Sequence, residues 1–128
     1  MQTHEVNAGT LRPAGGSATF GYDYMICRCL IVDVGNRLVV VDTGIGTRDI
    51  ASPISRLGRE WLDLINPVLD EGETLVVQLK ACGYEASDVT DIVLTHVHRD
   101  HVGGVDDFPG AKVHIFQPGN AGIRSHAQ

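Results

Sequence analysis

Positive charge is scarce in this sequence and is not clustered. The 128 residues include 10 lysines and arginines against 16 aspartates and glutamates, which gives a formal net charge of −6. A surface that binds nucleic acid needs grouped basic residues facing the phosphates, and no run of basic residues supplies them here. We therefore expect no nucleic-acid partner.

Cysteines and long apolar runs are also few. The three cysteines are an odd number, which does not suggest a disulfide framework. Cys27 and Cys29 are two residues apart in an apolar run, so both side chains face one side of a strand, where they serve as small core residues. No apolar stretch has the length of a membrane span, and residues 1–20 lack the pattern of a secretory signal. We therefore expect a cytoplasmic protein without a membrane partner.

The length predicts one domain over residues 1–128. Apolar and β-branched residues between turn signals predict strands at 2–7, 25–34, 37–41, 91–95 and 112–116. Apolar residues at helical spacing predict helices over 54–65 and 73–82. Gly35 and Asn36 predict a tight hairpin between the second and third strands. Loops are expected at 8–24, 45–53 and 117–128. Because helices alternate with buried strands, we expect an α/β fold in which helices cover a sheet.

Metal-binding side chains follow the strand predicted at 91–95. His96, His98, Asp100 and His101 lie within six residues. His96 and His98 are two residues apart, so they face the same side of an extended segment. Imidazole nitrogens and carboxylate oxygens are the ligands that Zn²⁺, Mn²⁺ or Fe accept. The motif therefore predicts a metal site at the carboxyl end of a buried strand, where α/β sheets place their sites.

The same string is similar to the signature of metallo-β-lactamase-fold hydrolases. It is followed by Gly103-Gly104, and Asp42-Thr43-Gly44 stands at the end of the strand predicted at 37–41, as in that family. The resemblance implies an αββα sandwich, of which this chain supplies about the first half. It also implies a metal-dependent hydrolase, in which a metal-bound hydroxide attacks an ester, lactone, thioester, amide or phosphodiester of a small-molecule substrate.

The resemblance assigns a role to each of these side chains. It implies that His96 and His98 hold a first metal ion, while Asp100 and His101 hold a second. Asp100 would also handle a proton as a catalytic residue, and Asp42 would orient the ligands through hydrogen bonds. The expected cofactor is one or two Zn²⁺ ions, with Mn²⁺ or Fe as alternatives.

The sequence departs from the family pattern after the motif. Family members are longer and supply further ligands downstream, whereas only His114 and His126 follow here, and no carboxylate follows Asp107. We expect His114 to face solvent or a polar neighbour, Asp106 and Asp107 to be solvated, and His126 not to coordinate. The chain therefore offers two incomplete metal sites. Either a partner chain, such as a second copy in a homodimer, completes the sandwich, or the chain is a remnant of a longer hydrolase.

Two other functions compete with hydrolysis at a metal. Asp42-Thr43-Gly44 after two valines resembles the active-site turn of aspartic proteases, in which two aspartates share a proton across a dimer. That interpretation leaves the histidines unexplained and gives the two predicted helices no place. The second alternative is a fragment that binds a metal without catalysis. Metal content, and inhibition by a chelator rather than by pepstatin, would distinguish these functions.

Overall fold

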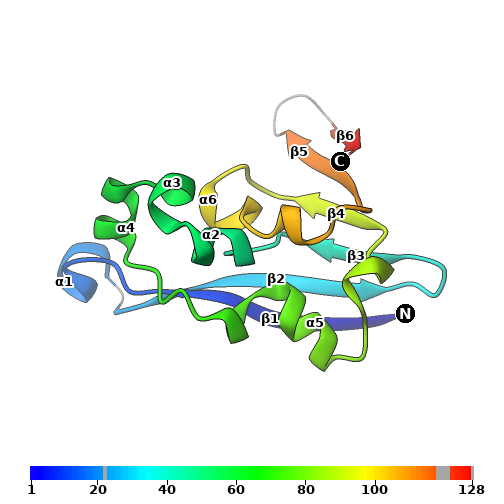
Figure 1. The fold of residues 1–128 in the computed structure, drawn as a ribbon, viewed down its shortest axis with the longest axis horizontal. Helices are drawn as coiled ribbons and strands as arrows, with labels where there is room; N and C mark the ends of the chain where they lie inside the picture. The colour runs from blue at the N-terminus through cyan, green and yellow to red at the C-terminus, as the bar shows by residue number, and fades with distance from the viewer. Residues whose placement is uncertain (22, 118–121, 128) are drawn as a thin grey trace.

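The computed structural model describes residues 1–21, 23–117 and 122–127. Its strands form one sheet in the order β1-β2-β3-β4-β5-β6 (Figure 1). β1 and β2 are antiparallel, as are β2 and β3, whereas β4 runs parallel to both β3 and β5, and β6 returns antiparallel to β5. The strands are β1 (Gln2–Leu11), β2 (Met25–Asp33), β3 (Leu38–Val41), β4 (Asp91–Leu94), β5 (Lys112–Gln117) and β6 (Gly122–Ala127). The predicted α/β class is confirmed.

The hairpin between β2 and β3 forms where it was expected. Asp33 pairs with Leu38, and the amide of Val34 donates to the carbonyl of Arg37 at 3.0 Å. Gly35 has a φ of 92°, in the left-handed region that glycine enters without steric cost. This turn fixes the register of two strands that lead to the candidate site.

Helices and short 3-10 turns connect the strands. The helices are α1 (Gly16–Phe20), α2 (Thr47–Ala51), α3 (Pro53–Leu57), α4 (Arg59–Ile65), α5 (Leu75–Ala81) and α6 (Arg99–Val102), and the turns are η1 (Glu71–Glu73), η2 (Ala86–Asp88) and η3 (Val105–Asp107). The helix predicted over 73–82 is α5. The one predicted over 54–65 is two helices, because Gly58 interrupts it at φ 85° and ψ 143°. None of the helices in the described ranges is long and apolar enough to cross a membrane.

Three segments expected to be loops contain regular structure. β1 continues to Leu11 through an irregularity between Asn7 and Thr10, and α1 and α2 form in the stretches 8–24 and 45–53. β6 lies within 117–128. It is formed by pairing with β5, and a local sequence pattern does not predict such pairing. Residues 118–121 and 128 lie outside the described part of the chain.

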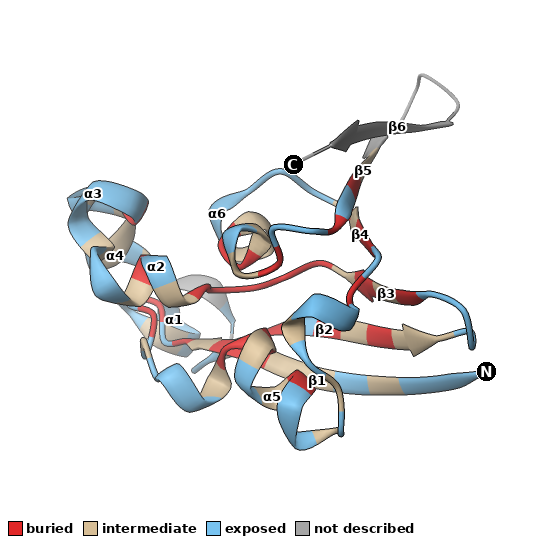
Figure 2. Cartoon of the chain, turned by 45° about the vertical axis from the view of Figure 1, so that its right-hand side comes forward, coloured by how far each residue is buried: buried red, intermediate tan, exposed pale blue. Residues whose placement is uncertain are grey.

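The core lies on one face of the sheet. Side chains of alternate strand positions are buried, as the red and tan bands along β2 show (Figure 2). Leu75 and Leu79 of α5 pack against this face together with Phe108. A smaller cluster holds Cys27 and, through its partly buried indole, Trp61 of α4. The sheet residues of the main cluster are Cys29, Ile31, Leu38, Val40, Ile92, Leu94 and Val113. The prediction that Cys27 and Cys29 are core residues is confirmed.

The opposite face of the sheet has no such cover among the described residues. Register and alternation place five apolar side chains there, which we call the open sheet face: Leu30, Val32, Val39, Val41 and Val93. All five are half-buried, and neither core cluster of the described residues includes them. The helices that belong to the two clusters therefore cover one face only.

Candidate metal centre

The parallel pairing of β3 and β4 brings two sequence motifs together. Val41 and Val93 are partners at the carboxyl ends of these strands, and the amide of Asp42 donates to the carbonyl of Val93 at 2.7 Å. Asp42 and Thr95 are thus the first residues beyond two adjacent strand ends. The histidine motif begins immediately after Thr95, so Asp42 lies beside it although 53 residues separate the two in the chain.

Asp42 is buried, and its carboxylate faces the motif. Its Oδ1 accepts from the amide of Thr95 at 2.9 Å, and its Oδ2 accepts from the Thr95 hydroxyl at 2.6 Å. The same Oδ2 lies 3.1 Å from Nδ1 of His101. That nitrogen is buried, and its direction toward Asp42 does not meet hydrogen-bond geometry. A small rotation of the imidazole would make Asp42 its acceptor, which is the interaction that commonly orients a ligating histidine.

The other predicted ligands of the motif lie near the ring of His101. With Nδ1 of His101 facing Asp42, its Nε2 lies 3.7 Å from Oδ2 of Asp100. The ring of His96 lies 4.9 Å from the ring of His101 and 5.8 Å from the ring of His98, centroid to centroid. His96 and His98 are exposed, while Asp100 and His101 are half-buried. The structure therefore groups all four predicted ligands at one end of the sheet.

The donor set fits a divalent metal ion of the Zn²⁺, Mn²⁺ or Fe type, because it offers three imidazoles and one carboxylate. Within residues 1–21, 23–117 and 122–127, no three His, Cys, Asp or Glu side chains already converge on one point. His96 and His98 are the side chains that would have to move. Both are exposed, and His96 has one hydrogen-bond contact, 3.2 Å from the Thr95 hydroxyl to its Nδ1, so a change of rotamer costs them little.

Thr43 joins the loop after β3 to the helix that carries His101. Its amide and its hydroxyl both donate to the carbonyl of His101, at 2.9 and 2.8 Å. The hydroxyl in turn accepts from the amide of Gly104 at 3.0 Å. The Asp-Thr-Gly string therefore acts through two residues: the carboxylate of Asp42 contacts the imidazole of His101, and Thr43 holds its backbone.

An ion pair between the buried Asp49 and the more exposed Arg56 holds the same two loops together. Asp49 accepts from the amide of Gly46 at 2.9 Å and from Nε of Arg56 at 3.0 Å. Arg56 also donates to the carbonyl of Gly103 at 3.3 Å and to Asp106 at 3.0 Å. Burial opposes the charge of Arg56, but the two carboxylates outweigh it and raise the pKa of this guanidinium. Sequence reasoning missed Asp49 and Arg56, because both partners of Arg56 across the site lie 47 and 50 residues away.

Asp106 is exposed, as expected, whereas the prediction that Asp107 is solvated is wrong, because Asp107 is half-buried and its carboxylate is hydrogen-bonded. Asp106 forms ion pairs with Arg48 and Arg56. Asp107 accepts hydrogen bonds from the amide and the hydroxyl of Thr47, at the start of α2. Both carboxylates therefore tie η3 to helices α2 and α3, and neither belongs to the motif's group of donors.

His114 lies away from the motif, as expected for a strand histidine with a polar neighbour. Its Nε2 is 2.8 Å from Oδ2 of Asp91, which is the first residue of β4, whereas the motif follows the last. His126 lies in β6, where its backbone pairs with Val113, and its side chain is outside the described part of the structure. Neither histidine is shown contributing to the candidate centre.

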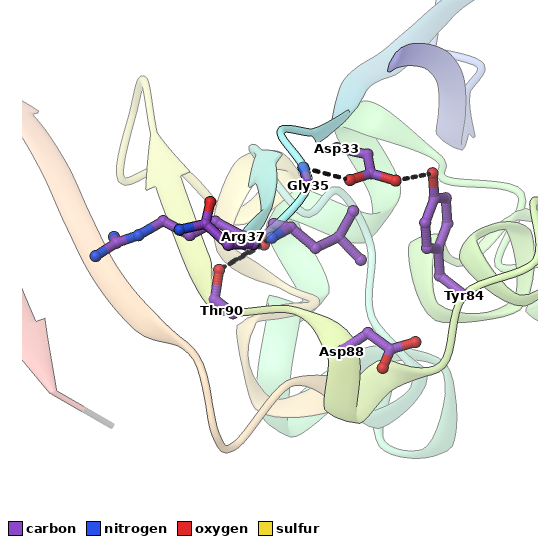
Figure 3. Close-up of a pocket in the computed structure, with 8 residues that line it drawn as sticks. Asp33, Gly35, Arg37, Tyr84, Asp88 and Thr90 are labelled. Atoms are coloured by element: carbon purple, nitrogen blue, oxygen red, sulfur yellow. Dashed lines mark hydrogen bonds between the residues drawn. The ribbon is translucent and has the colours of Figure 1, made fainter. Parts of the chain in front are cut away.

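A polar pocket of about 210 Å³ lies at the opposite end of the sheet (Figure 3). It is lined by the β2–β3 hairpin and by residues that precede β4. The carboxylate of Asp33 accepts there from the amide of Gly35 and from the hydroxyl of Tyr84, both at 2.9 Å. These bonds lower the pKa of Asp33. The two hydrogen bonds of Asp33 hold the hairpin against the segment that carries Tyr84.

The buried position of Asp42 also bears on the aspartic-protease alternative. That mechanism needs a carboxylate exposed at a two-fold axis, where it shares a proton with its copy. Here both oxygens of Asp42 already face Thr95 and His101 within the same chain. The structure therefore does not support that alternative.

Comparisons with known proteins agree with this geometry. The family model of the metallo-β-lactamase superfamily matches residues 22–115. A probable metallo-hydrolase of Mycobacterium tuberculosis is 36% identical over 115 residues, which is 90% of this chain and 34% of that protein. An N-acyl homoserine lactonase of Agrobacterium fabrum is 44% identical over 55 residues, which is 43% of this chain and 20% of that protein.

Solved structures show the same fold. An N-acyl homoserine lactone hydrolase, with its product bound at the catalytic metal centre, superposes with a TM-score of 0.66 at 24% identity. The match covers 87% of this chain and 46% of that one. The chain thus matches between about a fifth and about a half of the length of these relatives, and its fold corresponds to about half of their sandwich. Fold and sequence together show that the chain belongs to the metallo-β-lactamase superfamily.

Proposed function

We propose that this chain carries the metal-binding part of a hydrolase that cleaves carboxylic esters, with lactones as the first substrates to test. His96, His98, Asp100 and His101 would hold one or two metal ions, Zn²⁺ by default. The observation that carries the proposal is the contact of Asp42 with Nδ1 of His101, which leaves Nε2 beside Asp100. The similarity to lactonases supports the choice of substrate, and thioesters, amides and phosphodiesters remain further candidates.

Each residue would have a distinct task in hydrolysis. A divalent ion bound at the motif would lower the pKa of water and polarise the scissile carbonyl. Asp100 would accept the proton of the attacking water and return it to the leaving oxygen. Asp42 would hold the imidazole of His101 in one orientation and one tautomer. Thr43 would keep the backbone of His101 from shifting, through its two bonds to that carbonyl.

Metal content after dialysis tests the ligand set. We expect near-stoichiometric Zn²⁺, Mn²⁺ or Fe per chain in the unchanged protein, and its loss in the double variant His96→Ala/His98→Ala. His114→Gln is the matched control, because His114 bonds to Asp91 at the other end of β4 and glutamine can keep that bond. Equal metal content in the double variant and in the control would contradict the ligand assignment, as would an unchanged protein without metal.

Hydrolysis is then measured on N-acyl homoserine lactones and on a panel of simple esters, with and without a chelator. Turnover that the chelator abolishes supports the proposed reaction. Metal binding without turnover on any of these substrates favours the second candidate, a non-catalytic metal-binding chain. That candidate rests on the absence, among the described residues, of three donor side chains that already converge on one point.

A further inference from the structure

A second pocket adjoins the histidine motif. It has a volume of about 480 Å³ and lies over α4, with Arg99 of the motif in its wall. A neighbouring pocket of about 310 Å³ shares Leu57 and Arg99 with it and continues to Val102 and Gly103. Because Arg99 stands between His98 and Asp100 in the sequence, this wall is contiguous with the proposed ligands. We call the larger cavity the α4 pocket; it is lined by Leu57, Gly58, Arg59, Glu60, Trp61, Leu64 and Arg99.

The apolar part of the α4 pocket is held in place by the core. Trp61 is half-buried and packs against Leu11, Cys27 and Ile45, so its indole cannot swing away from the wall. Leu57 is 2% exposed, whereas Leu64 is 51% exposed and stays available to a ligand. Pockets of a few hundred Å³ with an apolar wall and a few polar groups are typical of small-molecule sites.

The α4 pocket holds two guanidinium groups without a carboxylate partner in the described residues. Arg28, Arg37 and Arg56 each form an ion pair with a carboxylate. Arg59 and Arg99, in contrast, have no ion pair or hydrogen bond within the described part of the chain, yet both line this one pocket. The lining sets one carboxylate, that of Glu60, against these two guanidinium groups, so the pocket carries a net positive charge in a chain whose net charge is −6. A guanidinium binds carboxylate or phosphate through paired, charge-assisted hydrogen bonds.

We propose that the α4 pocket binds the part of the substrate that carries an oxyanion head group, carboxylate or phosphate, on an apolar chain. Arg99 and Arg59 would bind the head group, while Trp61 and Leu64 would contact the chain. The inference rests on the proposed function, since it places the bond to be cleaved at the neighbouring motif. It adds a property that the motif does not imply, namely a preference for anionic over neutral substrates.

Fluorescence of the chain reports on this pocket directly, because Trp61 is its one tryptophan. The full chain is titrated with octanoate, octyl phosphate and octanamide, which share the apolar chain and differ in the head group. We expect octanoate or octyl phosphate to change the emission and to bind about tenfold more tightly than octanamide, which is the effect of one charge-assisted bond. The tighter of the two identifies the head group.

Two variants and a control locate the binding. Arg99→Gln and Arg59→Gln should each weaken binding of the anion by about tenfold and leave octanamide binding unchanged. Arg28→Gln removes a guanidinium that pairs with Glu5 on β1, away from the pocket. This control should change neither the affinity for the anion nor the affinity for octanamide. Equal affinity for the anions and octanamide, an equal effect of Arg28→Gln, or no emission change with any ligand would overturn the inference.

The titration is independent of hydrolysis. Selective anion binding without turnover would leave the pocket assigned and count against the proposed function. Turnover of neutral lactones without selective anion binding would support the proposed function and overturn the pocket's role.

Discussion

Gly46 permits a backbone contact on which the candidate site depends. A Cβ at this position would lie 2.1 Å from the carbonyl oxygen of Gly103. The loops that carry Gly46 and Gly103 are both held by hydrogen bonds, so neither backbone can move away easily. We expect Gly46→Ala to lower the free energy of unfolding by about 3 kcal/mol, the cost of severe overpacking, measured by urea denaturation. Gly110→Ala is the control, because a Cβ there meets nothing within 4 Å. Equal midpoints for the two variants would contradict this account.

Burial makes two of the three thiols unreactive. Burial, aided by the negative charge of Asp100, raises the pKa of Cys27 to about 12, and burial together with the neighbouring Cys27 raises the pKa of Cys29. Since the thiolate is the reactive form, iodoacetamide at pH 8 should modify about one thiol of the folded chain, the half-buried Cys82. Mass spectrometry should find all three modified in denaturant. Rapid modification of Cys27 in the folded chain would show that this part of the core opens.

The sequence predicted some side chains of the candidate site and missed others. The motif predicted four ligands because they are neighbours in the chain, and the Asp-Thr-Gly string pointed to Asp42. The string contains Thr43 but assigned it no role, and nothing local pointed to Arg56, whose partners Gly103 and Asp106 lie in the far loop. Asp49 was missed although its partners Gly46 and Arg56 are near it in the sequence. The partners of Asp106 and Asp107 were missed because they belong to α2 and α3, far from η3 in the sequence. Contacts between such distant segments follow from how the strands pair in the sheet, and the local sequence does not predict them.

Asp91 links β4 to β5 and to the β2–β3 hairpin, and it makes their packing sensitive to acid. Its carboxylate contacts Arg37 at 3.3 Å and His114 at 2.8 Å. Burial alone would raise its pKa, but hydrogen bonds from Thr90 and His114 and the charge of Arg37 outweigh burial and lower it. A pKa below the unfolded value of about 3.9 stabilises the fold fully above that value, and the effect disappears as pH falls through the folded pKa.

We therefore expect the thermal midpoint to fall as pH is lowered below about 4. Asp91→Asn should lower the midpoint at pH 7 and flatten this acid dependence. Asp63→Asn, at an exposed position of α4, is the control and should leave both unchanged. Parallel pH curves for Asp91→Asn and the unchanged protein would show that Asp91 does not link acid to unfolding.

Helices and strands were predicted best where one local signal dominates. The β2–β3 hairpin has a turn that only few residues can form, and α5 has a continuous apolar stripe followed by Gly83 at φ 95°. The stripe over 54–65 is real, but Gly58 redirects the chain within it, and spacing alone does not reveal a backbone angle. β6 was missed because its hydrogen bonds come from β5 and not from its own sequence.

The open sheet face governs how the molecule behaves in solution. Its five apolar side chains are only half-buried, and a contiguous apolar patch at the surface marks a face that another layer covers, which agrees with the expected partner chain or second copy. We predict that the mass of the chain rises with concentration in light scattering and that it binds a hydrophobic dye. Val39→Lys, on this face, should reduce both effects with little change in the thermal midpoint.

Val40→Lys is the matched control for that prediction. Val40 neighbours Val39 but faces the core and is 0% exposed, so a lysine there would bury an unpaired charge and unfold the chain. Similar melting of the two variants would mean that Val39 is covered as well. A monodisperse monomer at every concentration would contradict the expectation of a partner copy.

The long separation between Asp42 and Thr95 sets an order of events during synthesis and folding. Asp42 leaves the ribosome 53 residues before Thr95, which donates hydrogen bonds to it, whereas the four proposed metal-binding side chains of the motif emerge almost together. Contacts between distant segments form late, because closing the intervening loop costs entropy. A nascent chain would therefore present its histidines before Asp42 and Thr43 can orient them. Any selection among competing metal ions would then be made by the folded molecule, after translation of this segment has ended.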